Sequence, residues 1–206
     1  MKKIVITGNI GSGKSKVTEI LKDLGYKTAS ADEISAKILR ENHKEVTKMF
    51  SMPPQGFETF KKRLSDMIFG DQDEFPYNFK EQLEDFMLPK INKEIDKLYK
   101  ENLGIIIEMP TFFENRGLNK ELQDEYFIIH VFTKDDIRLD RIKERNPKLS
   151  EKDIKNRMKS QIHPSDKIEF SQYNISNNGS IERLIQRVKN LILVIGDLED
   201  ADKIKY

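Results

Sequence analysis

Short apolar runs alternate with amphipathic helical segments along most of the chain. Residues 4–7 form a first apolar run, and residues 14–24 then repeat apolar side chains at the spacing of one helix face, with Gly25 after them as a stop signal. Residues 104–109 and 127–132 are apolar at consecutive positions, which is typical of strands buried between two helical layers. The alternation predicts an α/β fold of three layers, in which helices cover both faces of a central parallel sheet.

Four more segments complete this predicted sheet and its helical layers. We expect strands at residues 26–30 and 173–176, and helices at residues 32–41 and 181–195. The acidic residues after Gly196 are expected to fray. A chain of 206 residues needs only one domain of this kind.

Two long stretches depart from the alternation and predict parts inserted into this domain. Residues 42–103 hold a turn with two prolines and a glycine, followed by helical spacing at residues 57–69 and 79–99, so we expect a small helical insert there. A second stretch contains four arginines on two expected helices, and the second of these helices begins at a capping box, Ser150 to Asp153. The predicted domain therefore has a core at residues 1–41, 104–133 and 169–195, an insert at residues 42–103 and a lid at residues 134–168.

The strongest chemical signal lies between the first predicted strand and the first predicted helix. The sequence there reads G-x-x-x-x-G-K-S, the pattern of a phosphate-binding loop in the structural context that it requires. Glycines let backbone N–H groups turn toward a phosphate, the helix amino terminus adds positive charge, the lysine reaches β- and γ-phosphate oxygens, and the serine hydroxyl ligates Mg²⁺. The predicted nucleotide-binding residues are Gly8, Asn9, Ile10, Gly11, Ser12, Gly13, Lys14 and Ser15, and Lys14 is also predicted to act in catalysis.

Asp32 is the next residue with a specific chemical meaning. It follows the second predicted strand, at the edge of an open α/β sheet where ligands bind. A carboxylate there could accept the proton of a hydroxyl group that attacks a phosphate, which makes Asp32 a candidate catalytic base. The structural alternative is that Asp32 caps the helix that follows it.

Glu108 and the arginines of the predicted lid are further candidates for phosphate chemistry. Glu108 lies near the end of an apolar strand, in the manner of the acidic residue that holds Mg²⁺ directly or through water in phosphate-loop proteins. Ser15 and Glu108 are therefore the predicted metal-binding residues, with a bond to a backbone amide as the structural alternative for Glu108. Phosphoryl transfer also needs cations around the transferred group, and the lid is the arginine-dense segment of the sequence. Among its arginines we predict that Arg141 acts in catalysis.

Composition argues against several other classes of protein. Lys and Arg total 36 and Asp and Glu total 35, so the chain lacks the positive field that draws proteins to nucleic acid or anionic membranes. It has no cysteine and three scattered histidines, which argues against disulfides and against a thiolate or histidine-rich metal site. Its apolar runs are far shorter than the roughly 18 to 20 residues of a membrane span. We therefore expect a cytoplasmic protein that binds small molecules, as a monomer or weak oligomer.

Taken in order, these motifs resemble those of the dephospho-CoA kinase family of P-loop kinases, and the resemblance spans nearly the whole chain. It implies transfer of the γ-phosphoryl group of ATP to the ribose 3′-hydroxyl of dephospho-CoA, the last step of coenzyme A biosynthesis, with Mg²⁺. It further implies that Asp32 is the base, that residues 134–165 form a lid over ATP and that Asn177 lies near the adenine. The motifs that carry the resemblance lie at residues 7–15, 31–34, 108–114, 141–161 and 175–177.

Departures from the family pattern fall mainly where the acceptor would bind. Ser30 stands where the family usually has an aspartate, and Leu88 stands where it usually has a histidine. The Asp-Arg pair expected near Phe60 is missing, and Lys16 replaces the usual small hydroxyl residue after the phosphate loop. The nucleotide half of the site is thus closer to the family pattern than the acceptor half.

The nearest alternative is a nucleoside or deoxynucleoside monophosphate kinase, which shares the same core. An acceptor phosphate would need arginines in the insert, and residues 42–103 contain only Arg63. A nearby Asp32 carboxylate would also repel it, by roughly 4 kcal/mol for two unit charges ~4 Å apart. These considerations favour a hydroxyl acceptor.

Two alternatives without kinase activity are also open. Thr133 to Asp136 mimic the T-K-x-D motif that reads guanine in GTP-dependent switches, but no D-x-x-G motif occurs in the chain. A degenerate phosphate-loop protein could instead bind nucleotide without catalysis.

Overall fold

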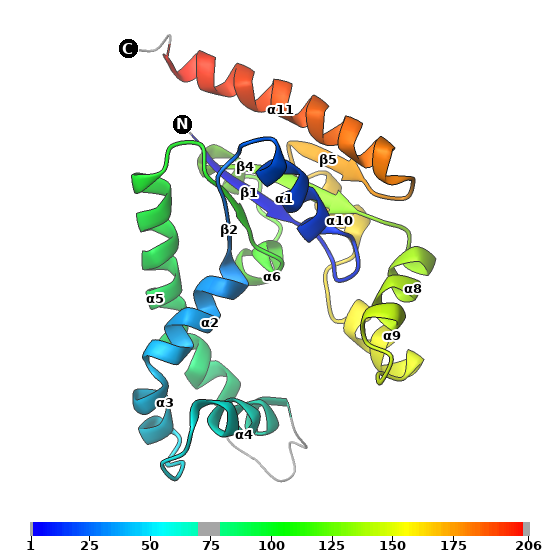
Figure 1. Cartoon of the computed structure of the whole chain (residues 1–206). Helices are drawn as coiled ribbons and strands as arrows, with labels where there is room; N and C mark the ends of the chain where they lie inside the picture. Colours follow the sequence, from blue (N-terminus) through cyan, green and yellow to red (C-terminus); the bar gives the residue numbers. More distant parts are fainter. Residues whose placement is uncertain (1, 70–78, 204–206) are drawn as a thin grey trace. The chain divides into compact units, whose positions relative to one another are not determined.

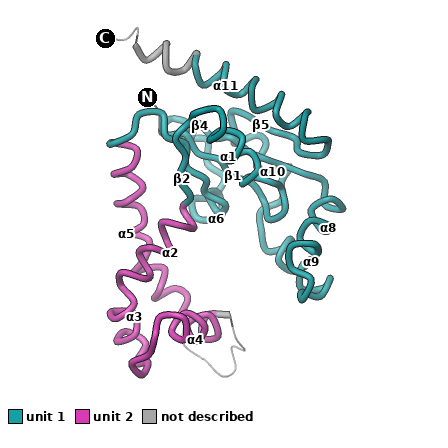
Figure 2. Tube along the Cα trace, in the orientation of Figure 1, with its two compact units in different colours: residues 1–30, 101–206 teal, residues 31–100 magenta. Residues whose placement is uncertain are grey.

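The structure, a computed structural model, describes the backbone of residues 2–69 and 79–203 and the side chains of residues 2–68 and 79–196. The chain divides into two compact units, which are coloured teal and magenta in Figure 2. The first unit comprises residues 1–30 and 101–206, and the second comprises residues 31–100. Each unit is built around its own buried core.

A five-stranded parallel sheet forms the centre of the first unit (Figure 1). The strand order is β2-β3-β1-β4-β5, so the first strand lies in the middle of the sheet. The predicted α/β fold with a parallel sheet is confirmed. All carboxyl ends of the strands lie at one edge, where loops can bind ligands. The strands are β1 (Lys3–Thr7), β2 (Thr28–Ser30), β3 (Ile106–Glu108), β4 (Tyr126–Phe132) and β5 (Tyr173–Ser176).

Helices cover both faces of this sheet. Ile6, Leu21 and Leu191 are fully buried in the core that joins one face to α1 and α11. On the opposite face, the ring of Phe112 in α6 meets that of Tyr126 in β4 edge-on, with 5.0 Å between the ring centroids. The helices of this unit are α1 (Lys14–Asp23), α6 (Phe112–Arg116), α7 (Leu122–Glu125), α8 (Asp135–Arg145), α9 (Glu151–Lys159), α10 (Pro164–Ile168) and α11 (Ile181–Lys203).

Most of the predicted boundaries in this unit hold, with one clear exception. The N-cap half of the predicted capping box is confirmed, because Oγ of Ser150 accepts a hydrogen bond of 3.1 Å from the backbone N–H of Asp153, and the same Oγ donates a bond of 2.6 Å to Oδ2 of Asp153. The expected fraying after Gly196 is wrong as far as Lys203, where α11 ends. A glycine costs a helix only about 1 kcal/mol relative to alanine, which a long packed helix tolerates. Among the residues that the structure describes, no helix is long and apolar enough to cross a membrane.

The second unit is entirely helical in its described residues. Val46, Phe60 and Leu64 are buried in its core, and the rings of Phe50 and Phe79 meet edge-on with 5.3 Å between their centroids. Phe60, one of the departures noted above, is thus a core residue of this unit. The unit begins at Ala31, earlier than the insert that we predicted from residue 42, because α2 packs against α3. Its helices are α2 (Ala31–Glu41), α3 (His43–Met49), α4 (Phe57–Phe69) and α5 (Phe79–Glu101), which reaches the boundary with the first unit.

Candidate active site

The predicted phosphate loop connects the carboxyl end of β1 to the amino end of α1. Gly11 and Gly13 have φ angles of 77° and 89°, in the left-handed region that favours glycine. A Cβ atom at Gly13 would lie 2.1 Å from Nδ2 of Asn177, and one at Gly8 would lie 2.2 Å from the backbone oxygen of Val131. Glycine is therefore required at Gly8 and Gly13 because neighbouring segments approach the loop too closely for a side chain.

Side chains from the segments that follow β4 and β5 hold this loop in place. Oγ1 of Thr133 and Nδ2 of Asn177 each donate a hydrogen bond of 2.9 Å to the backbone oxygen of Ser12. Nη2 of Arg141 donates a bond of 3.1 Å to the backbone oxygen of Asn177. These bonds give the loop a preorganised shape, which reduces the reorganisation needed when a phosphate binds.

Lys14 is buried against the loop that precedes it. Only 8% of the residue is exposed, and Nζ donates hydrogen bonds to the backbone oxygens of Gly8 at 2.8 Å and Asn9 at 3.2 Å. The ammonium group therefore lies at the loop that would hold the β- and γ-phosphate groups of a nucleoside triphosphate. The predicted catalytic role needs this position, and the role itself stays a prediction.

Glu108 lies at the carboxyl end of β3, where both of its oxygens contact hydroxyl groups of α1. Oε1 accepts a hydrogen bond of 3.3 Å from Oγ of Ser15, and Oε2 accepts one of 3.1 Å from Oγ1 of Thr18. The two predicted metal-binding residues are thus brought together. Thr18 was not predicted, although it follows Ser15 by three residues and so shares its helix face.

The oxygen donors at this position fit Mg²⁺. A carboxylate and a hydroxyl are hard ligands, and Mg²⁺ usually takes one or two such protein ligands together with substrate phosphates and water. Within the described residues, no group of three or more His, Cys, Asp or Glu side chains is placed to hold a metal ion. A metal here would therefore depend on a bound phosphate for the rest of its ligands.

The four arginines of the predicted lid have different surroundings. Arg141 is half-buried beside the phosphate loop, as described above. Arg138 is only 1% exposed, and its Nε donates a hydrogen bond of 2.9 Å to the backbone oxygen of Ile10. Arg145 and Arg157 are exposed. The structure therefore places Arg141 at the site, as predicted, and reveals Arg138 as a second arginine that supports the loop.

The sequence matches the model of a known protein family. The family model described as Dephospho-CoA kinase matches residues 3–183. The chain belongs to the dephospho-CoA kinase family. This confirms the resemblance seen in the motifs, and it makes the chain a member of a family of P-loop kinases, which are transferases.

Several dephospho-CoA kinases from bacteria align with most of this chain. The dephospho-CoA kinase of Wolinella succinogenes is 31% identical over 202 residues, which cover 93% of this chain and 94% of that protein. The dephospho-CoA kinase of Campylobacter jejuni strain RM1221 is 37% identical over 183 residues, which cover 85% of this chain and 87% of that protein. A solved structure of dephospho-CoA kinase from Campylobacter jejuni has a TM-score of 0.70 and 32% identity, covering 97% of this chain and 100% of that one.

Asn177 is predicted from the family resemblance to lie near the adenine. Its side chain is buried and donates to the backbone oxygen of Ser12, and its backbone oxygen accepts a hydrogen bond of 3.2 Å from Oγ1 of Thr133. In this family member Asn177 therefore supports the phosphate loop. Its contact with adenine stays a prediction.

Asp32 is the second residue of α2, within the first turn of the helix rather than before it. The capping alternative therefore does not fit, although an acidic residue in the first turn still stabilises the helix through its dipole. The carboxylate is exposed and belongs to the second unit, whereas the phosphate loop belongs to the first. Its role as catalytic base stays a prediction.

A buried polar cluster on the α6 side of the sheet was missed by sequence reasoning. Lys167 in α10 is fully buried, and its Nζ lies 2.6 Å from Oε1 of Glu114 in α6. His130 in β4 is also fully buried, with Nδ1 3.2 Å from Oδ1 of Asn174. The pKa of His130 is lowered to about 4, mainly by burial and also by the positive charges of Lys167 and Lys14, while the bond with Asn174 opposes the shift.

We expect His130 to make the protein less stable as the pH falls from 6.5 toward about 4. In this range the unfolded chain binds a proton that the folded chain does not, so the free energy of unfolding rises with pH; outside it, the residue has the same charge in both states. The loss at a pH of ~5 should be about 2 kcal/mol relative to neutral pH. Urea unfolding at both pH values measures it.

The control for this pH dependence is His130→Gln, which has no titratable group. We expect the variant to be less stable at neutral pH, because a packed polar side chain has changed, but to lack this part of the pH dependence. An unchanged difference between the two pH values would assign the effect to other groups.

Proposed function

We propose that this chain transfers the γ-phosphoryl group of ATP to the ribose 3′-hydroxyl of dephospho-CoA. The observation that carries the proposal is a complete phosphate loop, with Glu108 beside Ser15, in a chain that belongs to the dephospho-CoA kinase family. The named relatives described above, which cover most of the chain, support the same acceptor. ATP and dephospho-CoA would then be its two small-molecule substrates.

In this proposal the phosphate loop holds the triphosphate and orients its γ-phosphorus. The loop N–H groups and the positive amino end of α1 favour the anion, and Lys14 contributes a full positive charge. Arg141 stands beside the same loop, where its guanidinium can stabilise the charge that spreads over the transferred group. Positioning and charge are the main contributions a protein makes to phosphoryl transfer.

Mg²⁺ belongs to the proposal as a cofactor that Ser15 and Glu108 would hold. When bound, the ion would neutralise part of the charge on the β- and γ-phosphate oxygens. Thr18 would keep the Glu108 carboxylate oriented, since its hydroxyl already donates to Oε2. Residues that orient a metal ligand in this way usually contribute to metal affinity.

Asp32 is the proposed base on the acceptor side. The hydroxyl oxygen attacks the γ-phosphorus, the bond between that phosphorus and the β,γ-bridging oxygen breaks, ADP leaves, and the hydroxyl proton passes to the carboxylate. A nucleoside monophosphate would need no such base, because its phosphate is already ionised. The cytoplasmic location and the monomeric or weakly oligomeric state expected from the sequence stay predictions.

The proposed acceptor is tested by comparing substrates with the purified full-length protein. With ATP and Mg²⁺, we expect dephospho-CoA to give ADP release at least ~100-fold faster than any nucleoside monophosphate, since a site built to bind one acceptor rejects others strongly. Mass spectrometry of the product should show one added phosphate on dephospho-CoA. Faster turnover with a nucleoside monophosphate would mean that Ser30 and Leu88 mark a changed acceptor pocket.

A further inference from the structure

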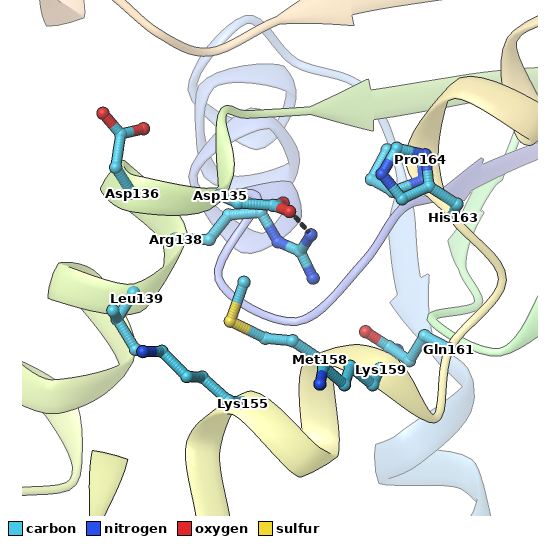
Figure 3. Close-up of a pocket in the computed structure, with 10 residues that line it drawn as sticks. All are labelled: Asp135, Asp136, Arg138, Leu139, Lys155, Met158, Lys159, Gln161, His163 and Pro164. Atoms are coloured by element: carbon cyan, nitrogen blue, oxygen red, sulfur yellow. Dashed lines mark hydrogen bonds and ion pairs between the residues drawn. The ribbon is translucent and has the colours of Figure 1, made fainter. Parts of the chain in front are cut away.

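A cavity of about 480 Å³ lies between α8, α9 and the segment that leads into α10 (Figure 3). This volume falls in the range of small-molecule sites. None of its lining residues belongs to the phosphate loop, and neither Glu108 nor Arg141 is among them. The cavity is therefore lined by residues of the predicted lid and not by the phosphate loop itself.

Arg138 supplies a buried charge at this cavity, and Figure 3 shows its guanidinium directed into the ring of lining side chains. Nε donates to the backbone oxygen of Ile10, and Nη1 donates a bond of 2.7 Å to Oδ1 of Asp135. Nη2 is buried and has no hydrogen-bond partner among the described residues. A guanidinium stays charged in a protein, and a buried donor without a partner is costly, so Nη2 is a position where an acceptor would bind favourably.

The rest of the lining suits a ligand with an apolar body. Leu139, Met158 and Pro164 supply apolar surface. Met158 also has a flexible side chain, which can adjust so that a ligand reaches Nη2. Lys155 and Lys159 add positive charge, although Lys155 is paired with Glu151. The carboxylates of Asp135 and Asp136 in the same lining offset part of this charge. The site therefore combines one buried donor on a cation with apolar walls.

The cavity is connected to the phosphate loop through the peptide groups of Ile10. Arg138 binds the backbone oxygen of this residue, and Oε1 of Gln161, which also lines the cavity, accepts a hydrogen bond of 2.8 Å from its backbone N–H. A ligand that contacts Arg138 therefore contacts a group that holds the loop.

We propose that this cavity binds a small organic anion, with its anionic group accepting a hydrogen bond from Nη2 of Arg138 and its apolar body lying against Leu139, Met158 and Pro164. The anion completes the hydrogen bonding of a charged group that the fold leaves incomplete. The site does not depend on the identity of the phosphoryl acceptor.

The test titrates the full-length protein with anilinonaphthalene sulfonate, a fluorescent apolar anion, in the absence of substrates. We expect saturable binding at one site per chain. Met158→Glu places a carboxylate in the cavity, where it competes with the probe for Arg138. The dissociation constant of the probe should therefore rise at least ~10-fold in this variant. Met158→Gln has the same shape without the charge and should change the constant by less than ~3-fold.

Two further measurements separate this site from other ways of binding the probe. Met49→Glu changes an exposed methionine on α3, outside the cavity, and should leave the affinity unchanged. Saturating Mg-ATP should also leave the probe bound, with its dissociation constant changed less than ~3-fold. Circular dichroism should show that each variant is folded.

Three results would overturn the proposal. The first is an affinity that Met158→Glu leaves unchanged. The second is binding of many probe molecules per chain, which indicates general adhesion to apolar surface. The third is a dissociation constant that grows in proportion to ATP concentration, which places the probe in the nucleotide site. Because every readout is direct binding, failure of the proposed kinase function would be seen separately, in the substrate assay.

Discussion

Lys14→Ala is expected to lower the rate of phosphoryl transfer by at least ~10³ while leaving a folded protein, because a cation at the transferred phosphate is worth several kcal/mol in the transition state. Nζ of Lys14 already lies against the phosphate loop, within hydrogen-bond distance of the backbone oxygens of Gly8 and Asn9. The alanine variant keeps the loop glycines and the bonds from Thr133 and Asn177, so the loop should keep its shape. Steady-state ADP release measures the effect.

The matched control for this variant is Lys16→Ala. Lys16 lies two residues further along α1, is exposed and pairs with Glu19 at 2.9 Å on the helix surface. A surface pair of this kind contributes at most about 1 kcal/mol to stability, so this variant should remain folded and keep nearly full activity. Equal activity of Lys14→Ala and wild type would mean that the loop does not bind the transferred phosphate as assigned.

The sheet could be predicted from sequence because its strands are buried on both faces. A strand covered by two helical layers becomes a continuous apolar run, and residues 104–109 contain β3 while residues 127–132 make up all of β4 except Tyr126. The short helices α7 and α10 were not predicted, since four or five residues are too few to show a helical period. The start of the second unit at Ala31 depends on how α2 packs against α3, which no local pattern reports.

Some residues of the site could likewise be predicted from a local motif, whereas others depend on contacts between distant parts of the sequence. The phosphate loop is one continuous motif, so its residues could be found without a structure. Gln161 reaches Ile10 across 151 positions in the sequence, and Arg138 reaches it across 128. Lys167 was missed for another reason, because lysine is rarely buried unless it is paired, and its partner Glu114 lies on a different helix.

These long-range contacts explain how residues outside the motif can affect the motif. Arg138, Gln161, Thr133 and Asn177 all bind backbone groups of the loop. Three of these side chains lie between β4 and α10, in or directly before the predicted lid, so a movement of that segment would change the bonds that hold the loop. The predicted lid and the phosphate loop should therefore be treated as one structural element of the first unit.

Asp32→Asn is expected to reduce turnover with dephospho-CoA by ~10² to 10⁴ and to leave ATP binding nearly unchanged, because general-base removal affects the acceptor hydroxyl and not the nucleotide. Asparagine has almost the same shape as aspartate. Asp32 is exposed in the first turn of α2, so losing its interaction with the helix dipole should cost no more than ~1 kcal/mol of stability. Steady-state kinetics and a direct ATP-binding titration separate the two effects.

Glu33→Gln is the matched control for Asp32→Asn, since Glu33 is the neighbouring acidic residue in the same turn and is also exposed. Both variants remove one negative charge from the first turn of α2, so both lose one interaction with the helix dipole. A large loss of turnover only in Asp32→Asn would assign the proton to that carboxylate. If both variants keep their turnover, the hydroxyl proton leaves by another route, because the charge at the amino end of α2 would then have no part in the reaction.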